Sequence, residues 1–196
     1  MKWMRRLYDW VLHWAHTKYA TPALILNSFA ESSFFPIPPD VLLIALSVSR
    51  RKKAIFYAFI TAVASVLGGI LGYYIGVALW ETVGEPIIRF YHAEELFEQL
   101  REMFREQSFI AVLIAAVTPI PYKVFTIAAG VADSDFMTFM IASIIGRSAR
   151  FFTVGILIYW FGEHIKTFID KYFNILSFLF IVLLILGIVV IKYFFN

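Results

Sequence analysis

The chain has 196 residues, of which 61% are hydrophobic and 18% aromatic, and its mean hydropathy is +0.77. A soluble domain of ordinary composition is closer to half apolar, so the composition predicts a membrane protein. The absence of cysteine excludes disulfides, thiolate catalysis and cysteine-based metal sites. The net charge of +3 says little by itself, because the position of the charges matters more. We expect no nucleic-acid partner and no metal or other cofactor.

Residues 1–18 are predicted to form an amphipathic helix in the lipid headgroup layer. Trp3, Leu7, Trp10 and Trp14 recur at helical spacing, and indole rings favour the boundary between lipid and water. The alternative is a first helix that packs on the bundle. No cleavable signal peptide is expected, because polar residues interrupt the apolar core that a signal peptide needs.

The next segment is predicted to be a hairpin broken by proline. Pro36, Pro38 and Pro39 interrupt an apolar run, and proline both lacks an amide hydrogen and clashes with the preceding helical turn. Backbone carbonyls freed at membrane depth survive only where they are buried in protein or line a wet cavity. Glu31 and Asp40 flank the break, and we expect them to face such a cavity.

This first unit, residues 21–80, is predicted to end with a transmembrane helix. Residues 54–80 form a 27-residue stretch without charge, which is long enough to cross roughly 30 Å of hydrocarbon. Four consecutive basic residues at 50–53 mark the cytoplasmic side, so the hairpin is predicted to be re-entrant from the cytoplasm. Glycines give the helix a bare face for packing within the chain or in a helix dimer: Gly68, Gly69, Gly72 and Gly76.

Residues 81–106 form a strongly polar insert with seven acidic residues against three arginines. Its apolar residues 96, 97, 100 and 104 lie along one helical face, with acidic residues at the start and basic residues at the end, as the helix dipole favours. We therefore expect an extracytoplasmic amphipathic helix whose charges are solvated.

Residues 108–162 are predicted to repeat the first unit. Residues 119–131, which include Pro119 and Pro121, align with residues 36–48 without a gap and share seven of 13 positions. The same offset places Gly155 on Gly72. The alternative explanation of the match is shared membrane composition.

The predicted fold is therefore an all-α membrane protein built on an inverted repeat. A helix over residues 136–162 would return to the cytoplasm, and residues 172–194 would cross the membrane once more. The two units would start from opposite sides of the membrane, and paired proline-broken segments of this kind indicate a binding site at the repeat interface. Fully spanning hairpins are the rival topology.

Five ionisable residues lie within apolar segments: Glu31, Asp40, Lys123, Arg147 and Arg150. Such residues are costly in a membrane and usually functional, so they form the candidate site for substrate and protons. Arg147 and Arg150 share a helix face and suit a phosphate group. The two carboxylates would balance them at rest or carry a proton. The alternative is a structural ion-pair network, expected above all between Asp40 and Lys123, which hold equivalent repeat positions.

The chain resembles the DedA family in three features. These are the motif E-x4-P-x-P-P-D from Glu31, the motif G-G-x-x-G-Y-Y-x-G from Gly68 and a second proline-broken segment that ends at Gly130. This family is also called the VTT or SNARE-associated Golgi protein family, and the first motif looks closest to its YqaA-like bacterial branch. The resemblance implies two facing re-entrant hairpins, an inner-membrane location and movement of lipids or lipid-linked phosphates between leaflets. It also implies essential roles for Glu31, Asp40 and arginines of the second half.

The leading functional hypothesis is a transporter or scramblase for a phospholipid or polyprenyl phosphate, with optional proton coupling through Glu31 or Asp40. A proton-linked carrier of small ions or cationic compounds and a non-transporting membrane assembly factor are the alternatives. An enzyme is not expected, because the sequence lacks the usual metal-protease, serine-hydrolase and phosphate-loop motifs. The expected partners are membrane lipids, and the sequence does not set the oligomeric state.

Overall fold

The computed structural model describes residues 19–34, 38–90, 92, 94–118 and 120–162. The predicted helices over residues 1–18 and 172–194, as well as Pro36 and Pro119, lie outside the described residues. The described secondary structure is helical, which confirms the all-α class. Its elements are α2 (Ala20–Glu31), α3 (Asp40–Ser49), the 3-10 turn η1 (Arg51–Lys53), α4 (Ala54–Leu79), the π-helical turn η2 (Trp80–Gly84), α5 (Glu85–Phe90), α6 (Glu94–Val117), α7 (Tyr122–Val131) and a final helix, Phe136–Gly162.

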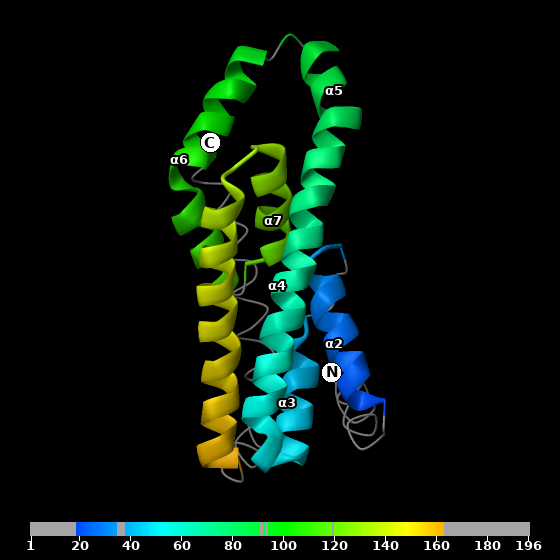
Figure 1. The fold of residues 1–196 in the computed structure, drawn as a ribbon, viewed down its shortest axis with the longest axis vertical. Helices are drawn as coiled ribbons and strands as arrows, with labels where there is room; N and C mark the ends of the chain where they lie inside the picture. Colours follow the sequence, from blue (N-terminus) through cyan, green and yellow to red (C-terminus); the bar gives the residue numbers. More distant parts are fainter. Residues whose placement is uncertain (1–18, 35–37, 91, 93, 119, 163–196) are drawn as a thin grey trace, which may run out of the picture.

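Two helical hairpins pack beside α4 in opposite senses (Figure 1). In the first, α2 rises from the lower end of the bundle and α3 returns to it. In the second, α6 descends from the upper end and α7 returns. The bends of both hairpins lie near mid-height, where Thr126 Oγ1 of α7 donates a hydrogen bond of 3.2 Å to Ser32 O at the first bend.

Proline defines both bends, as predicted from the sequence. The helix α2 ends at Glu31, and α3 begins at Asp40 with Pro39 as its N-cap. Pro121 is the N-cap of α7. Proline is tolerated at the start of a helix, because an amide hydrogen there has no partner within the helix. The predicted breaks in the two apolar segments are therefore confirmed.

Serine hydroxyls satisfy the carbonyls at the end of α2. Ser32 Oγ donates to Ser28 O at 3.0 Å, and Ser33 Oγ lies 2.9 Å from both Phe29 O and Gly68 O. Unpaired carbonyls in an apolar environment are costly, so irregular backbone needs partners of this kind. These carbonyls at the end of α2 thus find their partners within the protein.

The glycine face of α4 packs within the chain. A methyl group at Gly68 would lie 2.1 Å from Phe29 O of α2, and one at Gly76 would lie 2.1 Å from Ile127 O of α7. Both distances are far inside van der Waals contact, so only glycine lets these backbones approach. Of the other predicted packing glycines, Gly69 and Gly72 contact α7, and Gly155 of the final helix contacts the start of α4.

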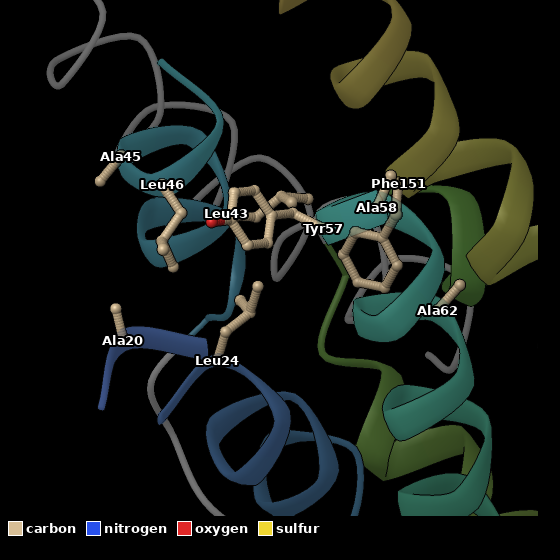
Figure 2. Packing of buried hydrophobic residues seen from close by; sticks show 9 residues of the cluster. All are labelled: Ala20, Leu24, Leu43, Ala45, Leu46, Tyr57, Ala58, Ala62 and Phe151. Carbon is tan, nitrogen blue, oxygen red and sulfur yellow. The ribbon is translucent and has the colours of Figure 1, made fainter. Parts of the chain in front are cut away.

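Two apolar clusters fill the described bundle, one below the bends and one above them. In the lower cluster, Leu24 of α2 and Leu46 of α3 converge on Tyr57 of α4 (Figure 2), and Phe151 of the final helix joins them. The upper cluster gathers residues of α4, α6, α7 and the final helix around Tyr122. The bends therefore lie between two separate cores.

The polar insert differs from the expected separate surface helix over residues 81–106. The helix of α4 continues through η2 and α5 to Phe90, and α6 runs unbroken from Glu94 to Val117. Because α6 contains no glycine or proline, nothing ends it where its composition changes from amphipathic to apolar. It therefore forms both the polar arm and the first limb of the second hairpin. The rings of Trp80 in η2 and Phe97 in α6 stack with their centroids 4.2 Å apart, so the extension of α4 and the start of α6 are in contact.

Two described helices, Arg51–Phe90 and Phe136–Gly162, are long and apolar enough to cross a membrane. They contain the predicted crossings over residues 54–80 and 136–162. Arg51 donates hydrogen bonds to Tyr159 O (2.6 Å) and Trp160 O (2.7 Å), so the basic residues 50–53 lie beside the end of the final helix.

The start of the final helix is capped by Asp135, whose Oδ2 accepts a hydrogen bond of 2.6 Å from Thr138 N. Hydrogen bonds from Thr138 lower the pKa of the Asp135 carboxyl below its ordinary value. The cap separates the final helix from α7 and fixes the direction in which it runs back along the bundle.

Candidate functional site

Arg147 and Glu31 form a buried ion pair. Arg147 lies within the Phe136–Gly162 helix and Glu31 is the last residue of α2, and Nη2 of the arginine donates to Oε2 of the glutamate at 3.0 Å. Their side chains are 3% and 11% exposed. Water screens neither charge effectively, so each depends on the other for compensation.

The guanidinium of Arg147 is held on both faces and on one edge. Its central carbon lies 4.7 Å from the ring centre of Tyr122 and 4.6 Å from that of Phe151, which is within the range of cation–π attraction. Its Nε donates to Ser65 Oγ on α4, and that hydroxyl is 2.7 Å from Ser32 Oγ. Since Tyr122 belongs to the upper cluster and Phe151 to the lower one, Arg147 lies where the two cores meet.

Arg150, one helical turn further on, connects the bends of both hairpins. Its Nε and Nη2 donate to Oδ1 and Oδ2 of Asp40 at 3.1 and 2.9 Å, in the two-pronged geometry that arginine and carboxylate favour. Its Nη1 donates to Thr118 O, just after α6. The pair is more open than the first, with side chains 18% and 23% exposed.

The predicted pairing of Asp40 with Lys123 is wrong. Both oxygens of Asp40 are taken by the guanidinium fork of Arg150, because Asp40 begins α3 beside the final helix. Lys123 belongs to α7, and neither buried ion pair includes it. The structure thus brings together four of the five predicted ionisable residues. The expectation that the carboxylates balance the arginines at rest agrees with this geometry.

Sequence reasoning missed the residues that hold Arg147 in place. Ser65, Tyr122 and Phe151 are ordinary in apolar helices, so composition did not single them out. Tyr122 alone carried a signal, because it stands at the second bend where the repeat has Pro39 at the first. Its hydroxyl donates to Ser143 Oγ at 2.6 Å, which orients the ring beneath the arginine.

The cluster of Glu31, Asp40, Arg147 and Arg150 is electrically balanced, with two cations and two anions. A guanidinium can present several N–H donors to a phosphate at once, whereas a carboxylate would repel it. The arrangement can therefore accept an anionic group on its arginines. No group of three or more potential metal ligands occurs among the described residues.

These features define a helical membrane protein with charged residues at the bends of two hairpins. The family model of the VTT domain matches residues 37–160. The chain therefore belongs to the VTT domain family, the DedA family, which confirms the resemblance seen in its proline and glycine motifs.

Three relatives are similar over most of their length, and each is described as an uncharacterized protein. A Haemophilus influenzae protein is 38% identical over 192 residues, covering 98% of this chain and 100% of its own. A Histophilus somni protein is 36% identical over 163 residues, covering 83% and 85%. A Methanocaldococcus jannaschii protein is 26% identical over 133 residues, covering 67% and 79%. No solved structure matches the chain at a significant level.

Proposed function

We propose that the protein moves a phosphate-bearing lipid between the leaflets of the bacterial inner membrane. The observation that carries this proposal is the balanced cluster of two arginines and two carboxylates at the bends of the hairpins, with one ion pair buried and the other partly buried. A lipid headgroup that reaches the bends would meet guanidinium donors there. Membership of the VTT domain family supports a membrane role related to transport or lipids.

The proposal includes two re-entrant hairpins that form an inverted repeat. Their opposite senses in Figure 1 support it, as does the placement of the basic residues 50–53 and the acidic arm at opposite ends of the bundle. Each hairpin would enter the membrane from one side, and their bends would meet inside it. A headgroup passing from one side to the other would then cross only the short distance around the bends.

The ion pairs favour an anionic substrate over the cationic compound of the alternative hypothesis. A cation would need Glu31 or Asp40, and both carboxylates already face a guanidinium. Removing one partner of a buried pair leaves the other charge uncompensated, which is strongly unfavourable. A phosphate can instead bind a guanidinium directly, without displacing either carboxylate.

The proposed topology predicts that single cysteines at Ser49 and Gln99 react with a membrane-impermeant maleimide from opposite sides of the membrane. The chain has no cysteine of its own, so each label reports one position. A cysteine at the buried Ser143 is the control and should stay unlabelled in intact membranes. Labelling of Ser49→Cys and Gln99→Cys from the same side would contradict the inverted arrangement.

The Glu31→Gln variant is expected to abolish lipid movement in protein that still folds, although it lowers the melting temperature because Arg147 loses its countercharge. Glutamine keeps the shape and an acceptor oxygen for Arg147 Nη2, but it removes the negative charge and the exchangeable proton. The measurement is an assay of fluorescent phosphatidylglycerol in liposomes, in which an impermeant quencher reports the outer leaflet. Glu98→Gln, on the exposed side of α6, is the matched control.

Two outcomes of that assay would contradict the expectations, and they are distinct. Transport at the wild-type rate by Glu31→Gln would reduce Glu31 to a hydrogen-bonding role. Failure of the wild-type protein itself to equilibrate phosphatidylglycerol, phosphatidic acid and a polyprenyl phosphate would contradict the proposed function.

A further inference from the structure

We infer that the two arginines have different roles: Arg147 binds the substrate phosphate through its Nη1 edge, whereas Arg150 ties the two hairpins together. This inference rests on the proposed function, because it names the phosphate-binding group within that site. It separates two residues that the sequence presents as an equivalent pair on one helix face.

The nitrogen atoms of Arg147 are not equally occupied. Nε is bonded to Ser65 and Nη2 to Glu31, whereas Nη1 makes no hydrogen bond with any residue that the structure describes. The described side-chain polar atoms that are both fully enclosed and unpaired are Ser47 Oγ and Ser134 Oγ, so Nη1 keeps contact with the surface. An arginine that is 3% exposed therefore retains one free edge with two N–H donors.

The surroundings of Arg147 leave one direction of approach. Tyr122 and Phe151 cover the two faces of the guanidinium, and Ser65 and Glu31 occupy two of its three nitrogens. Among the described residues, the direction left open to a ligand is therefore in the plane of the group, at Nη1. In-plane approach is the geometry in which a guanidinium binds phosphate oxygens. Arg147 can accept a phosphate in this way without giving up Glu31.

Arg150 has no comparable free edge. Each of its three nitrogens has a partner, two on Asp40 and one on Thr118 O. Asp40 begins the second limb of the first hairpin, and Thr118 follows the first limb of the second hairpin. A phosphate that bound the Nε and Nη2 edge of Arg150 would have to displace Asp40 and so detach the first hairpin. The contacts thus suit Arg150 to holding the bends together.

The test compares Arg147→Lys with Arg150→Lys, since both substitutions keep the charge. Purified protein in detergent is titrated with fluorescent phosphatidylglycerol to obtain Kd, and its melting temperature is measured without lipid. Loss of the charge-assisted hydrogen bonds in Arg147→Lys is expected to raise Kd about tenfold or more. Arg150→Lys is expected to lower the melting temperature. Its Kd is expected to stay several-fold below that of Arg147→Lys. Equal losses of affinity, or a larger loss in Arg150→Lys, would overturn the inference.

A second variant keeps the inference testable if Arg147→Lys does not fold. Phe151→Leu uncovers one face of the guanidinium but keeps both buried charges, so the Nη1 edge is less firmly placed. We expect Kd to rise about threefold or more, in line with the loss of one cation–π contact. Phe139→Leu removes an equally buried ring from the same helix, away from Arg147, and is the matched control. Identical Kd values for the two leucine variants would contradict the inference.

The binding and transport measurements separate this inference from the proposed function. If lipid binds with the expected dependence on Arg147 but does not change leaflet in liposomes, the inference stands and the proposed function fails. If lipid changes leaflet but Kd does not depend on Arg147, the proposed function stands and the inference fails.

Discussion

Arg147→Met is expected to destabilise the protein strongly. The substitution leaves Glu31 without its partner at a site where its side chain is only 11% exposed. Removing one partner of a buried ion pair typically costs about 3–5 kcal/mol, because the remaining charge stays uncompensated. Thermal unfolding in detergent, followed by circular dichroism at fixed protein and detergent concentrations, measures the effect.

The control for Arg147→Met is the same substitution at Arg89, which pairs with Glu85 on an exposed surface. Exposed pairs contribute little, with typical values of about 0–1 kcal/mol. A double variant that adds Glu31→Gln to Arg147→Met should recover part of the stability that Arg147→Met loses, because it removes the uncompensated charge. Substitutions at residues in contact are generally not additive in their effects on stability. A melting temperature for Arg147→Met as high as that of Arg89→Met would mean that the buried pair is not needed for folding.

Gly76→Ala is expected to have the second large effect, because it pushes α7 away from α4. The added methyl group would lie 2.1 Å from Ile127 O, a backbone atom that cannot move without shifting the whole of α7. In an unobstructed helix the same substitution would stabilise by about 1 kcal/mol through helix propensity. Overpacking costs about 1–3 kcal/mol and occasionally more, so we expect the clash to outweigh the propensity.

The effect of Gly76→Ala on α7 should also reach the charged cluster, because Tyr122 is the first residue of α7 and covers one face of Arg147. We therefore expect both a lower melting temperature and slower lipid movement. Ala78→Leu, at an exposed position two residues further along α4, adds more volume without a clash and is the control. A gain of stability in Gly76→Ala would show that α4 and α7 are not packed as closely as described.

The sequence predicted the parts of the fold that depend on local chemistry. Proline cannot continue a helix, so both bends could be placed from Pro38, Pro39 and Pro121 alone. A long run without charge indicated the position of α4, and the glycine spacing indicated its packing face. An ionisable residue in an apolar helix needs a partner, so the sequence predicted one site of five residues, four of which form the two ion pairs of the cluster.

The sequence could not predict which side chains from distant segments come into contact in the folded protein. The repeat made Asp40 and Lys123 equivalent, but equivalence in sequence does not bring side chains together, and the guanidinium fork of Arg150 took both oxygens of Asp40. The continuity of α6 was missed because a change of composition was taken for the end of a helix. Phe151 is one phenylalanine among 21 in the chain, and only its place beside Arg147 gives it a role.

The separation of the apolar interior into two clusters has a mechanical consequence. Between them lie ion pairs and hydrogen bonds, such as those from Arg150 to Asp40 and from Thr126 to Ser32. Apolar side chains that are pulled apart find no equivalent partner in water, whereas a polar group can exchange its partner for a headgroup or a water molecule. The two hairpin bends are therefore held to each other by exchangeable interactions, while α4 and the final helix run unbroken past them. A substrate that offers replacement hydrogen bonds lowers the cost of separating the bends without breaking either apolar cluster.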